Sequence, residues 1–303
     1  MLKSTSALTL KEELKKRHVS MSVLAFSFGA LLALPLAGDT IYNNLTPNNQ
    51  MAIASRQDSS SDFEIEAADD FLLKTQSIIT GASLVGLLVP TAGPQASISD
   101  VGAEIYRVFP NDSDAARTPD VPTRLNSPSD VAFDSRDSVA GDLSFSGSLL
   151  SATFTALNSV QPGGIHPKPL QTTNGNGPLT GLEVQFDVTF NAPLDLPADH
   201  YFFVPQVTVS GGQFYWLSAS RPINGAGTTP FAPDLQAWTR DANLDPDWLR
   251  VGTDIVGGQT PPTFNAAFSL DGTTVPEPTT VVLVLAGLAL IGTGRFRSGV
   301  MKR

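Results

Sequence analysis

The stretch Leu182-Glu183-Val184-Gln185-Phe186-Asp187-Val188-Thr189-Phe190 decides the fold class of this 303-residue chain. Apolar side chains occupy every second position of the stretch, and Glu, Gln, Asp and Thr occupy the positions between them. Because successive side chains of a β-strand point to opposite faces, this period of two predicts a strand with one buried face. No helical period is sustained between the two apolar ends of the chain, so we expect an all-β fold.

Similar β patterns recur between residues 63 and 272, and long segments rich in Pro, Asn, Asp and Gly separate them, as at 110–130, 161–178 and 222–233. Further strands are expected at 63–73, 78–89, 101–106, 143–156, 201–209, 213–218 and 264–270. The pattern over 143–156 changes register near Leu149-Leu150, which predicts a bulge or a turn. This combination predicts an antiparallel β-sandwich or jelly roll with long loops. Residues 39–62 are polar and turn-rich, and we interpret them as a loop or mobile leader.

The C-terminal 29 residues fall into three parts. Val275-Pro276-Glu277-Pro278 is stiff and non-helical, because each proline fixes its own φ and restricts the residue before it. Residues 279–294 carry no charge and predict a short transmembrane helix. The tail 295–303 is basic and predicts a cytoplasmic C-terminus. Its cationic side chains are Arg295, Arg297, Lys302 and Arg303. Gly272-Thr273-Thr274 precedes the motif and is interpreted as a flexible spacer.

This three-part order resembles the PEP-CTERM sorting signal of exported bacterial proteins, with Pro276, Glu277 and Pro278 as the motif residues. The resemblance implies that a membrane protease-transpeptidase, exosortase, recognises the segment 273–303 and removes it. The basic residues here are spread from Arg295 to Arg303, whereas the family usually has a tight Arg cluster. The alternative interpretation is an ordinary C-terminal membrane anchor.

The N-terminal residues 1–38 predict a secretory signal peptide, which implies export through the Sec translocon. A basic segment that includes Lys15, Lys16 and Arg17 precedes the apolar run Val19 to Ala37. A retained N-terminal anchor is the alternative. The predicted localisation is transit through the inner membrane, followed by the cell surface or the extracellular space.

The exported part is strongly acidic. Residues 39–275 contain 26 Asp and Glu against 10 Lys and Arg, a net charge of −16. Such a surface repels nucleic acid, so we expect no nucleic-acid partner. The chain has no cysteine, which excludes thiolate nucleophiles and Cys-ligated metal centres. Only His166 and His200 follow the signal region, which excludes a three-His zinc site; we expect neither to be catalytic.

Two clusters are candidates for ligand binding. Oxygen ligands stand at alternate positions in Asp241, Asn243, Asp245 and Asp247, as at the start of a calcium loop. Pro246 and Gly252 depart from that pattern, and an acidic turn is the alternative. Trp216 and Trp248 are candidates for an aromatic platform under sugar rings, the alternative being core packing.

The central region also resembles the exported β-rich domain common among PEP-CTERM proteins. The stretches that carry this likeness are Ala67-Ala68-Asp69-Asp70-Phe71, Tyr201 to Pro205, Phe214 to Trp216 and Asp245 to Trp248. This likeness supports the fold class and the compartment. Our first interpretation of the whole chain is a non-enzymatic surface or biofilm-matrix protein, processed by exosortase, with an exopolysaccharide as the candidate matrix partner. The alternatives are a secreted carbohydrate-binding or carbohydrate-active protein and a membrane-anchored receptor-like domain.

Overall fold

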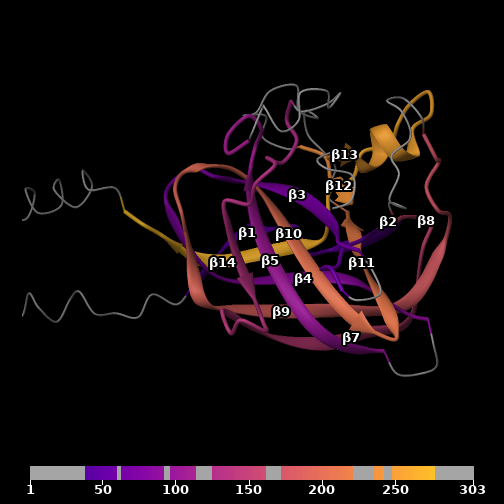
Figure 1. Ribbon diagram of the computed structural model, residues 1–303, viewed down its shortest axis with the longest axis horizontal. Coiled ribbons are helices and arrows are strands. Elements are labelled where there is room, and N and C mark those ends of the chain that lie inside the picture. The colour runs from indigo at the N-terminus through magenta and orange to yellow at the C-terminus, as the bar shows by residue number, and fades with distance from the viewer. Residues whose placement is uncertain are drawn as a thin grey trace, which may run out of the picture. The chain divides into compact units, whose positions relative to one another are not determined.

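The computed structural model describes residues 38–59, 63–91, 96–113, 125–161, 172–220, 235–241 and 248–276. By its contacts the chain divides into residues 1–37 and 38–303, and every described residue lies in the second unit. The described residues form strands in two sheets and one short π-helical turn, η2 (Val251–Val256). Figure 1 shows the longer strands as curved ribbons. The prediction of an all-β fold is confirmed.

The larger sheet has eight strands and is organised around β4. Along one side β4 pairs with β9 over nearly its whole length, and along the other it pairs first with β14 and then with β11. β1 pairs with β14, β2 with β11 and β7 with β9, and β8 pairs in parallel with β2 at the end of the sheet. The strands are β1 (Asp39–Asn43), β2 (Pro47–Ala54), β4 (Ser77–Pro90), β7 (Leu143–Ala156), β8 (Asn158–Val160), β9 (Leu179–Leu196), β11 (Gly212–Ala219) and β14 (Phe268–Thr274).

The smaller sheet has six strands in the order β13-β12-β3-β10-β5-β6. Its central strand, β10, pairs antiparallel with β3 on one side and with β5 on the other. The strands are β13 (Leu249–Arg250), β12 (Trp238–Asp241), β3 (Ile65–Leu73), β10 (Asp199–Ser210), β5 (Ser97–Arg107) and β6 (Asp134–Asp137).

Aromatic side chains join one face of each sheet. Phe203 of β10 lies with its ring centroid 5.3 Å from Phe268 of β14 and 6.1 Å from Trp216 of β11. Phe71 of β3 stacks on Tyr201 at 5.6 Å and meets Phe268 edge-on at 6.5 Å. These rings are at most 1% exposed. Large aromatic side chains bury extensive apolar area, so this cluster is the centre of the core.

Most of the predicted strands are confirmed. In β9, Val184, Phe186, Val188 and Phe190 are buried, while Asp187 and Thr189 are exposed, as the period of two predicted. The register of β7 against β9 shifts between Leu149 and Ser151, at the predicted position.

The leader predicted over residues 39–62 is wrong for most of its length, because β1 and β2 lie there. Met51, Ala52, Ile53 and Ala54 have no exposed surface. The asparagines that suggested a loop instead make tertiary hydrogen bonds; for example, Asn44 Nδ2 donates to the carbonyl oxygen of Ala266 at 3.1 Å. Gly272-Thr273-Thr274 is also no flexible spacer, because these residues form the end of β14.

Candidate functional site

A charged cluster lies on the face of the six-stranded sheet that is turned away from the aromatic core. We use this name for Glu66 of β3, Glu104 and Tyr106 of β5, and Arg240 of β12. Glu66 is 1% exposed and Tyr106 is 3% exposed. Alternation along the strands explains their position, since Ala67, Ala103 and Ile105 point to the opposite face and join the main core.

The four side chains of the charged cluster form one hydrogen-bonded network. The Tyr106 hydroxyl lies 2.6 Å from Glu66 Oε1 and 2.8 Å from Glu104 Oε2. Arg240 Nη2 donates to Glu66 Oε1 at 3.1 Å and to the Tyr106 hydroxyl oxygen at 3.0 Å. Arg240 Nε also donates to Glu66 Oε2. The guanidinium lies over the Trp248 ring at 4.6 Å, a cation–π arrangement.

Burial and the neighbouring charge of Glu66 determine which groups of this network carry protons. The Tyr106 hydroxyl has one proton, so it can donate to only one of its two carboxyl partners. Burial, followed by the charge of Glu66, raises the pKa of Glu104 to about 8. Burial and Glu66 likewise raise the pKa of Tyr106. Burial alone would lower the pKa of Arg240, but the Glu66 carboxylate raises it. The network therefore holds a neutral carboxyl group beside an ion pair.

The two aspartates of Ala67-Ala68-Asp69-Asp70-Phe71 serve opposite faces of β3. Asp69 Oδ2 accepts a hydrogen bond from the Ala266 amide at 2.8 Å, just before β14 of the other sheet. Asp70 Oδ2 lies 2.6 Å from His200 Nε2, and its Oδ1 accepts from the Leu235 amide at 2.9 Å. All three side chains, Asp69, Asp70 and His200, are at most 2% exposed. Through these hydrogen bonds, Asp69 and Asp70 bind the segments at Ala266 and Leu235 and the side chain of His200 to β3.

The predicted sugar platform is wrong for both tryptophans. Trp216 and Trp248 have no exposed surface. Trp216 Nε1 donates to the Ala267 carbonyl oxygen at 2.9 Å, and Trp248 Nε1 donates to the Ser129 carbonyl oxygen at 3.0 Å. Trp216 lies in the main core and Trp248 in a second core behind the six-stranded sheet, so no sugar ring can stack on them. The alternative reading, core packing, describes both.

The predicted calcium loop is described only at its first residue. Asp241 ends β12 opposite Ile65 and is 1% exposed. Asn243, Asp245 and Asp247 lie outside the described residues. Among the described residues, no three His, Asp or Glu side chains are grouped as a metal site. Calcium at this loop stays a prediction.

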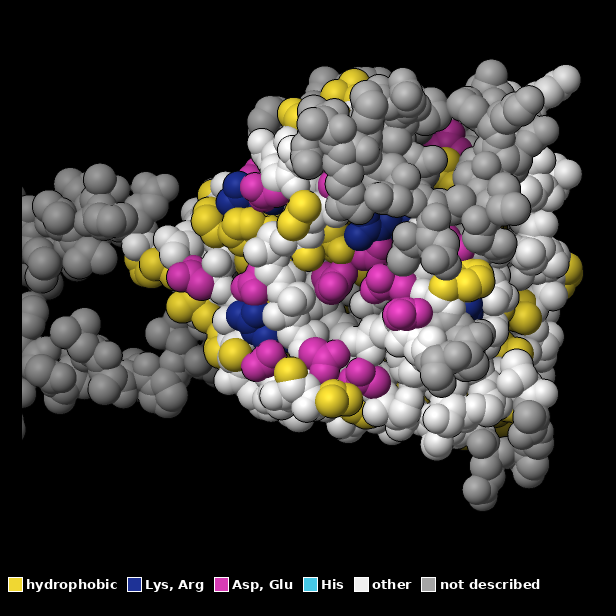
Figure 2. All heavy atoms as spheres, in the orientation of Figure 1, with side chains coloured by type: hydrophobic (Ala, Val, Ile, Leu, Met, Phe, Trp, Pro, Cys, Tyr) yellow, Lys and Arg dark blue, Asp and Glu magenta, His cyan; other side chains and the backbone are white. Residues whose placement is uncertain are grey.

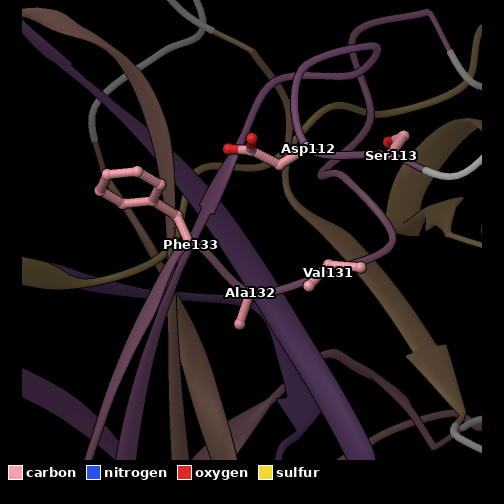
Figure 3. A pocket seen from close by; sticks show the side chains of 5 residues that line it. All are labelled: Asp112, Ser113, Val131, Ala132 and Phe133. Atoms are coloured by element: carbon pink, nitrogen blue, oxygen red, sulfur yellow. The ribbon is translucent and has the colours of Figure 1, made fainter.

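A pocket of about 430 Å³ opens beside the end of β5 (Figure 3). Asp112 and Ser113 line one side of it, and Val131, Ala132 and Phe133 line the other. Arg107 lies over the Phe133 ring at 4.2 Å, with its Nε 3.3 Å from Asp112 Oδ2. The lining is mainly apolar and Arg107 is engaged by Asp112, so this pocket suggests no chemistry. Acidic side chains are scattered over the face of the molecule shown in Figure 2.

The start of the sorting motif is joined directly to the sheet. β14 ends at Thr274, and the Val275 amide still donates to the Gln76 carbonyl oxygen at 2.8 Å. Pro276 is the last described residue; Glu277, Pro278, the predicted helix 279–294 and the basic residues Arg295, Arg297, Lys302 and Arg303 lie outside the described part. Among the described residues, no helix is long and apolar enough to cross a membrane.

Comparison with known proteins gives one finding, at this end of the chain. Residues 274–298 match the PEP-CTERM protein-sorting motif. The chain therefore carries this motif, which supports its assignment as a PEP-CTERM domain-containing exosortase substrate that is exported and passes the membrane before processing. No curated protein and no solved structure shows significant similarity to the chain.

Sequence reasoning did not find the charged cluster. Glu66 and Glu104 alternate with apolar residues in the same way as the solvent-facing Asp187 of β9, so the pattern alone gives no sign that they are buried. One signal was available for the neighbouring site. Two adjacent aspartates between Ala68 and Phe71 place one carboxylate on each face of a strand, and at least one of those faces must be buried.

Proposed function

We propose that this chain is a non-enzymatic protein of the cell surface or extracellular matrix, built as a β-sandwich and released or transferred by exosortase. The single observation that carries the proposal is the sorting motif at residues 274–298. The N-terminal segment directs the chain to the Sec translocon, and the C-terminal segment holds it at the membrane until processing. An exopolysaccharide is the candidate partner of the mature protein.

The position of β14 supports processing without loss of the fold. β14 pairs with β4 from Phe268 to Thr274 and with β1 from Ser269 to Gly272. The motif residues Pro276, Glu277 and Pro278 follow these ladders, so cleavage at the motif leaves every strand pair in place. We therefore expect the processed domain to be as stable as the unprocessed one.

The experiment compares the mature C-terminus of variants in a host that carries exosortase. Glu277→Gln, Glu277→Asp and Pro278→Ala should each slow removal of the tail, because a recognition element depends on its charge, chain length and backbone restriction. Mass spectrometry of the C-terminus and cell fractionation measure the processed fraction. Glu183→Gln, the same chemical change within β9, is the matched control and should be processed as fast as wild type.

Two outcomes would overturn the proposal. The first is wild-type protein that retains Val281 to Arg303 in such a host. The second is Glu277→Gln protein that is processed at the wild-type rate. Either result would leave the segment as a plain membrane anchor.

A further inference from the structure

β7 is an edge strand that pairs on one side with β9, and no second ladder of β7 occurs among the described residues. The regular part of its pairing runs from Leu143 opposite Phe190 to Leu149 opposite Val184. Figure 1 places β7 beside β9 along the lower side of the view. An edge strand presents a row of backbone N–H and C=O groups that can pair with another strand.

The middle of β7 is exposed on both faces. Ser146, Gly147, Ser148, Leu149 and Leu150 are all exposed, and the exposed fractions of the two leucines are 60% and 50%. By contrast, four successive residues of β2, Met51 to Ala54, are fully buried. At Leu149 and Leu150, whose side chains alternate in direction, the described chain therefore leaves both faces of β7 largely uncovered.

Leu149 belongs to the apolar face of β7 but lies beyond the cover of the second sheet. It follows Leu143, Phe145 and Gly147 at every second position. A Cβ at Gly147 would lie 3.8 Å from Phe186 and 3.9 Å from Ile98, so this side of the strand faces the core. Leu149, one step further on, is 60% exposed. The core face thus ends in an uncovered leucine beside an unpaired edge.

Up to its register shift after Leu149, β7 also lacks the residues that usually protect an edge. Its sequence, LSFSGSLLSATFTA, has no charged residue and no proline. Lysine, proline and inward-pointing charges are the common means by which proteins prevent edge-to-edge pairing. The chain as a whole carries a net charge of −10, so two copies repel each other over most of their surfaces. The uncharged β7 edge is a place where two copies can approach without that repulsion.

We propose that β7 is a homotypic assembly edge, at which Leu143–Leu149 of two copies pair antiparallel about a two-fold axis at Ser146. Such an isologous contact uses the same surface on both partners, so one uncharged edge suffices. The pairing joins two eight-stranded sheets into one and covers Leu149 of each copy. It goes beyond the proposed function, because it concerns how copies associate and does not depend on exosortase.

A single cysteine tests the register, because the chain has none of its own. Across the proposed axis Ser146 faces Ser146 of the second copy, and directly opposed Cα atoms in an antiparallel pair are about 4.5–5.5 Å apart, within disulfide range. In the purified full chain in mild detergent, Ser146→Cys should give a disulfide-linked dimer on mild oxidation. Ser144→Cys and Ser148→Cys are the matched controls, since each would face a serine and lie too far from its own equivalent.

A second variant tests the contribution of the edge to affinity. Leu149→Lys places a charge beside the pairing edge of both copies and should weaken the dimer at least about tenfold in sedimentation measurements at micromolar concentrations. Val139→Lys is the control, because Val139 is 77% exposed and lies outside β7. Thermal unfolding checks that both variants fold.

Preferential cross-linking at residue 146, together with weaker association of the Leu149→Lys variant alone, is the expected result. Equal cross-linking at all three serine positions, absence of cross-linking, or equal association of wild type and Leu149→Lys would overturn the proposal. Because none of these measurements involves tail removal, their failure would leave the sorting proposal untouched.

Discussion

The two faces of the six-stranded sheet are both largely buried, but the outer face adds a network of charged side chains to its apolar packing. On one face Phe71, Tyr201 and Phe203 pack against the other sheet. On the other face, from the same or neighbouring strands, Glu66, Glu104 and the Asp70–His200 pair lie under segments that include Ser129, Leu235 and Trp248. Alternation along a strand decides which residues share a face of this sheet. Whether that face is buried depends on the sheet or segments that pack against it.

Phe202 and Phe203 are adjacent on β10 and point to opposite faces, so alanine substitutions at these positions compare the faces directly. The largest expected loss of stability is at Phe203. Phe203→Ala should lower the free energy of unfolding by about 4 kcal/mol, because it leaves a cavity between the sheets among Phe268 and Trp216. Phe202→Ala, on the opposite face, should cost less, since Phe202 packs in the smaller second core. Urea unfolding measures both. A cost for Phe202→Ala that equals or exceeds that of Phe203→Ala would mean that the covered outer face carries the fold.

The second largest loss of stability is expected when the ion pair of the charged cluster is broken. Arg240→Met should cost about 3 kcal/mol, because it leaves the Glu66 carboxylate buried without its cation. Adding Glu66→Gln should recover part of this loss, since the remaining group is then uncharged. A double-mutant cycle in urea measures the coupling. If the double variant were no more stable than Arg240→Met, the burial of an unpaired charge would not be the cause.

Asp69 is the carboxylate of β3 that points toward the other sheet, and its substitution tests what the hydrogen bond to Ala266 contributes to stability. Asp69→Ala should cost about 2 kcal/mol, because the buried Ala266 amide loses its acceptor. Asp187→Ala, on the exposed side of β9, is the matched control and should change stability by less than about 0.5 kcal/mol. Equal effects of the two changes on the urea midpoint would contradict a specific role for Asp69.

The last prediction uses the pH dependence of stability and tests the outer face through Glu104. The pKa of Glu104 is raised from 4.5 to about 8 in the folded protein. A raised folded-state pKa contributes stability that is fully present below the unfolded value and is lost as pH rises through the folded one. Between pH 5 and pH 8.5 wild type should therefore lose more stability than Glu104→Gln. Parallel curves for the two proteins would show that Glu104 holds no extra proton.

The sequence was informative where one face of a strand is exposed and uninformative where both are covered. The alternation in β9 predicted its buried face because Asp187 and Thr189 do reach solvent. In β3 nearly every residue is buried, including Glu66, Asp69 and Asp70. Their burial depends on Arg240, His200 and the Ala266 amide, which lie more than a hundred residues away along the chain and which no local pattern connects to β3. β1 and β2 were missed for the same reason. Asn44, between them, suggested a loop, but its side chain donates to the distant carbonyl oxygen of Ala266.

The pairing of β14 has a mechanical consequence for the proposed retention of the chain at the membrane by its C-terminal segment. A pull on the chain beyond Pro276 reaches the domain through β14, which lies between β4 and β1. A force along the axis of this strand loads both ladders in parallel, so their hydrogen bonds must fail together. β14, which directly precedes the sorting motif, is thus also the strand at which the fold resists a force applied through the C-terminal segment.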